Sequence, residues 1–311
     1  MKGETLAGRD LISLLDFNTE ELERILEVAA EVKANPRHFA EALPGRTLFM
    51  YFEKPSLRTR VTFEAGMTQL GGHAIYFTAA DGKIGVRESV EDVARNLERW
   101  VDAAMCRTFS HDMVKELASF SQIPIINGLT DFLHPCQALA DYLTLQEVRG
   151  DLKGRRLAYV GDGNNVANSL MFGGARLGVH VTVITPEGFE PRDDVVATAR
   201  AAAAGTDATI EVTNDLDRVE GADAVYTDVW ASMGQEAEAA ERKKKFAPYQ
   251  VNMSVMERAG ADTVFMHCLP AHRGEEVTSD VADMPRSVIF QQAANRLHAQ
   301  KGVLLLLMGG D

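Results

Sequence analysis

The chain has 311 residues, of which 46% are hydrophobic and 25% are charged, a composition typical of a folded globular protein with a large core. This length exceeds what one hydrophobic core usually organises, so it predicts two packed lobes or one large α/β unit. The formal net charge of −13 repels nucleic-acid backbones and anionic membranes, and we expect neither as a partner.

The first half of the chain alternates predicted strands and helices. An amphipathic helix from Leu22 follows Asn18 and Thr19, which can cap its first turn. The expected strands are 47–52, 74–77, 103–107 and 123–126, and the helices that follow them in turn are 59–70, 90–100, 113–120 and one opened by Pro135. Such alternation predicts a mostly parallel sheet covered by helices.

A segment rich in glycine and charge, VRGDLKGRR at 148–156, indicates a boundary between two lobes. The strands expected in the second lobe are 157–160, 179–184, 208–212, 224–227, 263–266 and 287–290, with a helix at 195–204 among the helices between them. The lysines at 243–245 are expected on a solvated helix face. A final helix, 293–308, is apolar enough to need cover, and we expect it to pack on the first lobe. The fold class is therefore α/β, with two similar-sized lobes that are each a mostly parallel sheet flanked by helices.

The cysteines and the chain ends bear on the compartment. Cys106, Cys136 and Cys268 form no CxxC pair, and an odd number of cysteines favours a reducing compartment. The first ten residues lack the apolar segment of a signal peptide, and the apolar run 303–308 is too short to span a bilayer. We expect a cytoplasmic protein.

Polar residues follow the predicted strands of the first lobe. The segment SLRTR at 56–60 opens a helix, where backbone N–H groups and the helix dipole favour an anion, and its hydroxyls and arginines suit a phosphate. Arg107 ends the strand 103–107, and His134 and Gln137 flank the first turn of a later helix. Since parallel strands end at one rim, these groups should meet there. A neutral histidine beside a glutamine can hydrogen-bond a carbonyl oxygen while guanidinium groups hold a phosphate.

The second lobe begins with a partial dinucleotide fingerprint, VGDGNN at 160–165. Gly161 and Gly163 match its first two glycines, but Val166 stands where the third is required for close helix packing. The alternative interpretation is that Asn165 presents its amide to a small polar ligand.

Two later strand ends carry further candidates. Asp228 ends one strand and suits an ammonium group, and Ser232 and Met233 follow on a glycine-containing loop. His267 and Cys268 suggest a nucleophile or a metal site, but adjacent strand residues point to opposite faces and no HExxH motif or CxxC pair is present. A thiol or backbone contact to a ligand is the favoured interpretation of Cys268.

Six separated motifs occur in one order: FEKPSLRTRVTFEAG, HPCQALADYLT, VGDGNN, DVWASMGQE, HCLPAHRGEEV and NRLH. In these motifs and their spacing the chain resembles the ornithine carbamoyltransferases of the aspartate/ornithine transcarbamylase superfamily. The resemblance implies transfer of the carbamoyl group of carbamoyl phosphate to the δ-amine of L-ornithine, giving L-citrulline and phosphate in arginine metabolism, with no cofactor and no metal. It also implies a carbamoyl-phosphate-binding domain at 1–147 completed by 290–311, an ornithine-binding domain at 148–289, and an active site in the cleft between them.

The same resemblance implies the site residues. Those expected to bind carbamoyl phosphate are Ser56, Leu57 through its backbone, Arg58, Thr59, Lys83, Arg107, His134, Pro135, Cys136, Gln137, Cys268, Leu269 and Arg296. Those expected to bind ornithine are Asn165, Asp228, Ser232 and Met233. Those expected to act in catalysis are Arg58, Arg107, His134 and Cys268, with Arg107 and His134 stabilising a tetrahedral oxyanion.

The resemblance further implies a homotrimer in which the loop AADGKIG, residues 79–85, reaches the phosphate pocket of a neighbouring subunit. The chain departs from the family pattern at three positions. Leu57 stands where threonine is frequent, Lys83 where glutamine is common, and Ala294 where glutamate is usual before the Asn-Arg pair.

Three other functions stay open. A transcarbamylase acting on putrescine or an acylated ornithine is the nearest, although Asp228 and the SMG loop favour a free α-amino acid. A nicotinamide-binding oxidoreductase is opposed by the missing third glycine and by Thr185 and Pro186, which stand where an acidic ribose partner would be. A non-catalytic binding homologue is opposed by the intact set of cationic residues.

Overall fold

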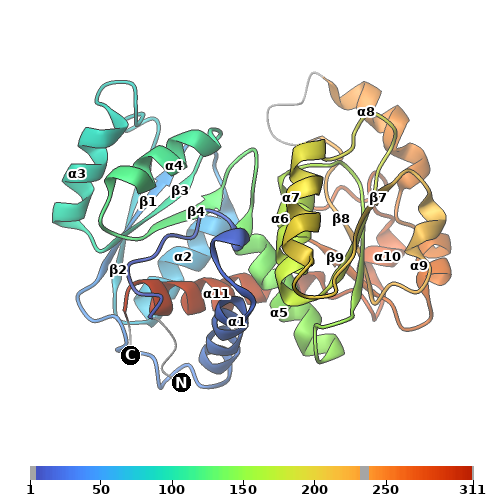
Figure 1. The fold of residues 1–311 in the computed structure, drawn as a ribbon, viewed down its shortest axis with the longest axis horizontal. Coiled ribbons are helices and arrows are strands. Elements are labelled where there is room, and N and C mark those ends of the chain that lie inside the picture. The colour runs from blue at the N-terminus through green and yellow to red at the C-terminus, as the bar shows by residue number, and fades with distance from the viewer. Residues whose placement is uncertain (1–4, 232–237, 310–311) are drawn as a thin grey trace. The chain divides into compact units, whose positions relative to one another are not determined.

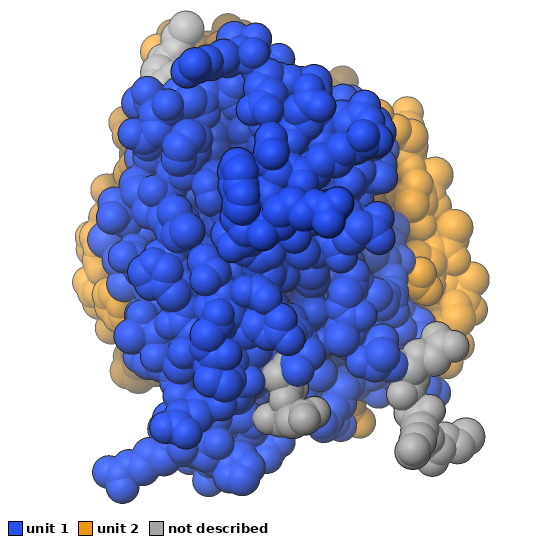
Figure 2. Space-filling view, turned by 90° about the vertical axis from the view of Figure 1, so that its left-hand side faces the viewer, with its two compact units in different colours: residues 1–143, 294–311 blue, residues 144–293 orange. Residues whose placement is uncertain are grey.

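The computed structural model describes residues 5–231 and 238–309. The chain forms two compact units, coloured separately in Figure 2. Unit 1 consists of Met1–Leu143 and Ala294–Asp311, and unit 2 consists of Thr144–Ala293. Each unit contains one parallel sheet with helices on its faces, which confirms the α/β class and the two mostly parallel sheets predicted from the sequence.

Unit 1 has a four-stranded sheet in the order β2-β1-β3-β4, with all neighbours parallel. Its strands are β1 (Thr47–Phe52), β2 (His73–Thr78), β3 (Ala103–Arg107) and β4 (Ile125–Leu129). Its helical elements are η1 (Leu14–Asp16), α1 (Thr19–Ala34), α2 (Leu57–Gln69), α3 (Val90–Trp100) and α4 (His111–Phe120), with parts of α5 (Pro135–Arg149) and α11 (Ile289–Leu307).

Helices cover both faces of the unit 1 sheet (Figure 1). On one face, apolar side chains of β1, β3 and β4 pack with those of α3 and α4 in one buried cluster. On the other face lie α1, α2 and α11. The carboxyl-terminal part of α11 packs directly on its neighbours, since Gly66 of α2 faces Leu297 and Lys301 and Gly302 lies against the α1 backbone. This packing gives the apolar final helix the cover that its sequence requires.

Unit 2 has a five-stranded sheet in the order β7-β6-β5-β8-β9, again parallel throughout. Its strands are β5 (Arg156–Val160), β6 (His180–Ile184), β7 (Ile210–Thr213), β8 (Ala224–Thr227) and β9 (Val264–His267). Its helices include α6 (Asn165–Leu177), α7 (Asp193–Ala203), η2 (Leu216–Val219), α8 (Ala239–Phe246), η4 (Ala247–Tyr249), α9 (Met253–Ala259) and α10 (Ser279–Asp283). Helices α6 and α7 cover one face, and α9 and α10 pack with an apolar cluster on the other (Figure 1).

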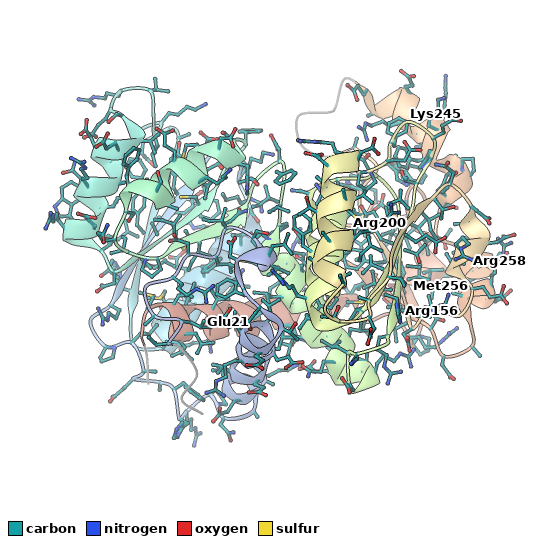
Figure 3. The ribbon with its side chains drawn as sticks, in the orientation of Figure 1. Glu21, Arg156, Arg200, Lys245, Met256 and Arg258 are labelled. Atoms are coloured by element: carbon teal, nitrogen blue, oxygen red, sulfur yellow. The ribbon has the colours of Figure 1, made fainter. Side chains whose placement is uncertain are left out.

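Local sequence signals account for several element ends. Asn18 caps α1 by accepting a hydrogen bond from the backbone of Glu21, whose carboxylate binds the Asn18 N–H in return. Thr19 is the first helical residue rather than the cap. The side chains at 243–245 on α8 are exposed, and Figure 3 shows Lys245 at the outer side of the unit, so the predicted solvated face is confirmed.

The clearest differences from the predicted strands lie at 287–290 and 123–126, and the ends of the other strands agree within two residues. The segment 287–290 is not a strand, because Ser287 makes one isolated bridge to Phe265 and α11 already begins at Ile289. A short apolar run cannot by itself distinguish a strand from the start of a buried helix. The strand predicted at 123–126 lies instead at Ile125–Leu129. Pro124 has no N–H to donate, and the N–H of Ile125 goes to the Asp10 carboxylate.

None of the helices within 5–231 and 238–309 has the length and hydropathy needed to cross a membrane. The three cysteines are thiols rather than members of disulfides.

The turn after β5 explains the second glycine of the VGDGNN motif. The Gly163 N–H donates to the Phe189 carbonyl oxygen at 2.8 Å, which brings two loops together. A Cβ at position 163 would lie 2.2 Å from the backbone nitrogen of Pro191. This glycine is therefore required by the close approach of the protein's own backbone.

We expect Gly163→Ala to lower the free energy of unfolding by about 1–3 kcal/mol or more, because neither backbone can move aside without breaking the loop contact. Gly205→Ala is the matched control, since Gly205 lies in the same unit and a Cβ added there would have no other atom within 4 Å. Its change should stay within about 0.5 kcal/mol. Urea unfolding of both variants measures this difference. Equal unfolding midpoints would show that the close backbone contact at Gly163 does not affect stability.

Candidate functional site

The amino terminus of α2 has the features of an anion site in unit 1. Ser56 caps the helix by accepting a hydrogen bond from the Thr59 N–H at 3.2 Å, and the first turn contains no acidic residue. The backbone N–H groups and the dipole of this turn favour an anion. Of the two arginines in SLRTR, Arg60 ion-pairs with Glu64 and lies over the Tyr76 ring.

The hydroxyl of Thr59 is shared by two buried arginines. Arg107 at the end of β3 donates to Thr59 Oγ1 at 3.3 Å, and Arg296 on α11 donates to the same oxygen at 3.2 Å. All three residues are buried, with Arg296 only 2% exposed. Residues 59, 107 and 296 thus come from three distant stretches of sequence and meet at one atom.

Gln137 binds the other terminal nitrogen of the Arg296 guanidinium group. Its Oε1 accepts from Arg296 Nη1 at 2.7 Å, while its Nε2 donates to Asp141 Oδ1 at 2.7 Å. Asp141 is fully buried, one helical turn after Gln137 on α5. The sequence reasoning missed Asp141, although its i+4 spacing from Gln137 in HPCQALAD is a usable signal. Arg296 is thus held by hydrogen bonds to both Gln137 and Thr59.

His134 lies among the cations of this site. Its side chain is buried, and burial together with the charges of Arg296, Arg107 and Arg58 holds the pKa of His134 well below its ordinary value. The imidazole is therefore neutral near pH 7. It can offer a hydrogen bond to a carbonyl oxygen without adding to the positive charge around it.

A β-bulge lies beside Arg107, and the sequence did not reveal it. Cys106 pairs with Asn127, but Arg107 pairs with Leu129, so Gly128 is skipped in the ladder. A Cβ at Gly128 would lie 2.4 Å from Met105 Sδ. Bulges bend a strand and redirect side chains next to them, and this one sits where the arginine leaves the sheet.

The lysines near the site are matched to acids. Lys83, in the loop 79–85, lies 3.7 Å from Glu53 Oε1 of the same chain, with its side chain 56% exposed. Lys54 is buried, pairs with Asp131 and lies over the Phe109 ring. The expected role of Lys83 in a neighbouring subunit is untested and stays a prediction.

The residues after His134 pack inward. Pro135 begins α5, and the Cys136 thiol donates to the Asn127 carbonyl oxygen at 3.4 Å. Burial raises the pKa of Cys136 to about 12, so it remains a thiol. The Cys136 side chain is buried in the core of unit 1. Its expected contact with carbamoyl phosphate stays a prediction.

Unit 2 presents a buried carboxylate at Asp228, directly after β8. Its Oδ2 accepts from Asn164 Nδ2 at 2.9 Å, and its Oδ1 accepts from the Val229 N–H at 2.8 Å and from Cys268 Sγ at 2.9 Å. Asn164 also caps α6 with its carbonyl oxygen. The sequence reasoning named Asn165, the first residue of α6, and missed this second role of its neighbour.

The side chains of His267 and Cys268 lie closer together than the alternation of adjacent strand residues predicts. Asp228, His267 and Cys268 each offer a potential metal ligand atom, and these atoms lie within 4.8 Å of one another. The alternation rule fails because β9 ends at His267 and the chain then turns at Leu269, whose φ is 60°. Both ring nitrogens of His267 already have partners, Leu269 N and Glu276 Oε1, so a metal would have to displace them.

The expected ornithine ligands Ser232 and Met233 lie outside the described residues. The segments on either side of them are joined by Arg242 of α8, which donates to the Trp230 carbonyl oxygen and to Asp162 Oδ2, both at 3.0 Å. Burial raises the pKa of Asp162, and the Arg242 charge opposes that shift.

The structure thus brings two sets of predicted residues together, each within its own unit. Unit 1 gathers Arg58, Thr59, Arg107, His134, Gln137 and Arg296. Unit 2 gathers Asp228 and Cys268. Fold and site define an α/β protein with an arginine-lined anion site on one unit and a buried acid on the other.

Comparison with known proteins agrees with this class. Residues 9–147 match the family described as aspartate/ornithine carbamoyltransferase, carbamoyl-P binding domain, and residues 153–307 match its Asp/Orn binding domain. The chain belongs to the aspartate/ornithine carbamoyltransferase family.

Individual relatives are similar over nearly their whole length. An ornithine carbamoyltransferase of Anoxybacillus flavithermus is 55% identical, with 97% of this chain and 98% of the relative covered. The solved structure of the ornithine carbamoyltransferase from Pyrococcus furiosus has a TM-score of 0.95 at 54% identity, with 99% of each chain covered. The enzyme from Thermus thermophilus has a TM-score of 0.86 at 43% identity, with 95% of this chain and 97% of that chain covered.

The depressed pKa of His134 predicts a pH dependence of stability. Below about pH 6.5 the unfolded chain binds a proton at His134, whereas the folded chain does not. The neutral His134 therefore makes its full contribution to the free energy of unfolding above pH 6.5. Below pH 6.5 the free energy of unfolding falls by up to about 1.4 kcal/mol per pH unit. Urea unfolding between pH 7.5 and 5.5 measures this loss, and His134→Asn should show a smaller one. Parallel profiles would contradict a buried neutral imidazole.

Proposed function

We propose that this chain is an ornithine carbamoyltransferase that moves the carbamoyl group of carbamoyl phosphate to the δ-amine of L-ornithine, releasing L-citrulline and phosphate. Residues 1–147 with 290–311 form the carbamoyl-phosphate-binding domain, and residues 148–289 form the ornithine-binding domain. The enzyme works in the cytoplasm, which its cysteine thiols support. The observation that carries the proposal is the convergence of Arg58, Arg107 and Arg296 on neutral His134.

Carbamoyl phosphate is opposite in charge to this cationic set. The phosphate lies at the first turn of α2, held by Ser56, the Leu57 backbone, Arg58, Thr59 and Arg107. Helix N–H groups and guanidinium forks are the donors that phosphate oxygens prefer. Gln137 and His134 take the carbamoyl group, where a neutral imidazole and an amide can hydrogen-bond a carbonyl and an NH2.

The reaction requires the protein to orient the two reactants and to place positive charge beside the oxyanion. The neutral δ-amine of ornithine attacks the carbamoyl carbon, and a tetrahedral oxyanion forms that Arg107 and His134 stabilise. The intermediate collapses with cleavage of the bond to phosphate, a good leaving group, and the proton lost by the amine leaves with the phosphate. No covalent intermediate on the enzyme is required, in keeping with the buried thiol of Cys136.

Ornithine meets an acidic group in unit 2. Asp228 is buried, and its hydrogen bonds to Asn164 and Cys268 hold the carboxylate in one orientation. It binds the α-ammonium group, and Asn165 binds the α-carboxylate. Cys268 and Leu269 contribute a thiol and a backbone group to the reacting centre.

Purified protein should form citrulline from carbamoyl phosphate and ornithine, and putrescine should be a poor acceptor because it has no α-carboxylate for Asn165. Turnover of putrescine without ornithine would overturn the choice of substrate. Tight binding of NAD in a calorimetric titration would favour an oxidoreductase instead.

Variants assign the two reactants to their residues. Arg58→Ala should weaken carbamoyl phosphate binding by about 100-fold or more, the effect expected for a lost charged donor, without unfolding the protein. Arg95→Ala is the control, because Arg95 is exposed on α3 and pairs with Glu91. Asp228→Asn should weaken ornithine far more than carbamoyl phosphate, and equal losses for both ligands would contradict its assignment.

The active assembly is a homotrimer with phosphate sites completed by the loop 79–85 of a neighbouring subunit. Exposed apolar side chains on α2 and the edge strand β2, Leu57, Val61 and Ile75, support an interface on this side of unit 1. The Lys83 side chain is more than half exposed, which supports its reaching another chain.

Mixing two impaired variants tests this arrangement. Arg58→Ala and Lys83→Ala should each have low activity, but a refolded mixture should regain part of it. A hybrid trimer contains sites that combine Arg58 of one chain with Lys83 of the next. If both residues acted within one chain, no native site would form and activity would stay low. Sedimentation of the wild type should give about three times the 34.0 kDa chain mass.

A further inference from the structure

We propose that Glu276 and His267 form a positioning pair for the turn at Cys268 and Leu269. In this arrangement the Glu276 carboxylate determines which ring nitrogen of His267 carries the proton, and the other nitrogen holds the turn in its active shape. The inference rests on the proposed function, which gives Cys268 and Leu269 roles at the reacting centre.

Both members of the pair are fully buried. His267 ends β9, and its Nε2 lies 3.1 Å from Glu276 Oε1, with neither side chain exposed to solvent. The same carboxylate oxygen accepts from the His272 N–H at 2.5 Å. The backbone of Glu276 is tied to the Val251 N–H at 2.9 Å. The carboxylate is therefore a fixed acceptor.

The contact on the other ring nitrogen identifies the tautomer. The backbone N–H of Leu269 donates to His267 Nδ1 at 2.8 Å. A backbone N–H cannot accept, so Nδ1 must present its lone pair, and a neutral ring then carries its proton on Nε2. That proton points at Glu276 Oε1. The opposite tautomer would set two N–H groups against each other at Leu269 and leave the carboxylate without this donor.

The turn that this bond holds is a strained one. Leu269 has a φ of 60°, a left-handed conformation that leucine rarely adopts and that persists only where surrounding contacts enforce it. Cys268 precedes it and donates its thiol to Asp228 Oδ1 at 2.9 Å. If the Leu269 N–H lost its acceptor, the turn would relax and the thiol would shift away from the carboxylate. His267 thus acts on the reaction through its neighbours.

A matched pair of substitutions separates the two ring nitrogens. Asparagine at position 267 can place its carbonyl oxygen where Nδ1 lies, whereas glutamine places its amide toward the Nε2 end and leaves the Leu269 N–H without an acceptor. We expect His267→Asn to keep kcat/KM for ornithine within about 10-fold of the wild type and His267→Gln to lose about 100-fold or more, because small displacements of reacting groups have effects of that size. Thermal unfolding of both variants, which remove the same buried ring, is expected to show similar losses of stability.

A second pair of substitutions tests the role of Glu276. Glu276→Gln keeps an oxygen facing both His267 and the His272 N–H, and Glu276→Met removes it. The ¹⁵N spectrum of histidine-labelled protein should show His267, assigned by its absence in His267→Asn, with Nε2 protonated and Nδ1 bare in the wild type and in Glu276→Gln. This pattern should be lost or mixed in Glu276→Met, with activity falling in parallel.

A protonated Nδ1 in the wild type would overturn the proposal, as would equal kcat/KM losses in His267→Asn and His267→Gln. If the wild type forms no citrulline, the proposed function fails, while the ¹⁵N spectra of the wild type and the Glu276 variants still decide the tautomer. If both His267 variants fail to fold, the spectra and activities of the two Glu276 variants decide whether the proposal holds.

Discussion

The shared hydrogen bonds of Arg107 and Arg296 to the Thr59 hydroxyl are the contact on which the rest of unit 1 depends. Burying two guanidinium groups beside each other costs free energy unless donors are satisfied and charge is compensated. Here the Thr59 hydroxyl and the Gln137 side-chain oxygen each accept from a guanidinium group. A phosphate bound beside these groups would bring opposite charge to them, and this attraction connects the fold to carbamoyl phosphate.

Chain topology supplies the converging groups. Thr59 stands in the first turn after β1, Arg107 at the end of β3, and His134 just before α5, as parallel strands with one common rim require. Arg296 arrives differently, on a helix that returns from the far end of the sequence and packs on α1 and α2. In unit 2 the same principle places Asp228 after β8 and Cys268 after β9, on neighbouring strands.

Periodicity and strand-end rules predicted much of this architecture. They located β1, β3 and β8 at their observed residues and placed Arg107, His134 and Asp228 at strand or helix ends. These rules failed where the surroundings of a single residue determine its local structure. The run 287–290 resembles a strand until its neighbours fix it as the start of a helix, and the bulge at Gly128 has no signal of its own. Asn164 and Glu276 act through contacts that only the folded chain reveals.

A crystal structure of the protein with carbamoyl phosphate bound would show whether the phosphate lies at the first turn of α2. We expect phosphate oxygens within hydrogen-bond distance of the first-turn N–H groups of α2 and of Arg58, with the carbonyl oxygen facing Arg107 and His134. Neutral His134 should remain in place beside the ligand. Density for the phosphate away from α2, for example on the VGDGNN turn after β5, would contradict this expectation.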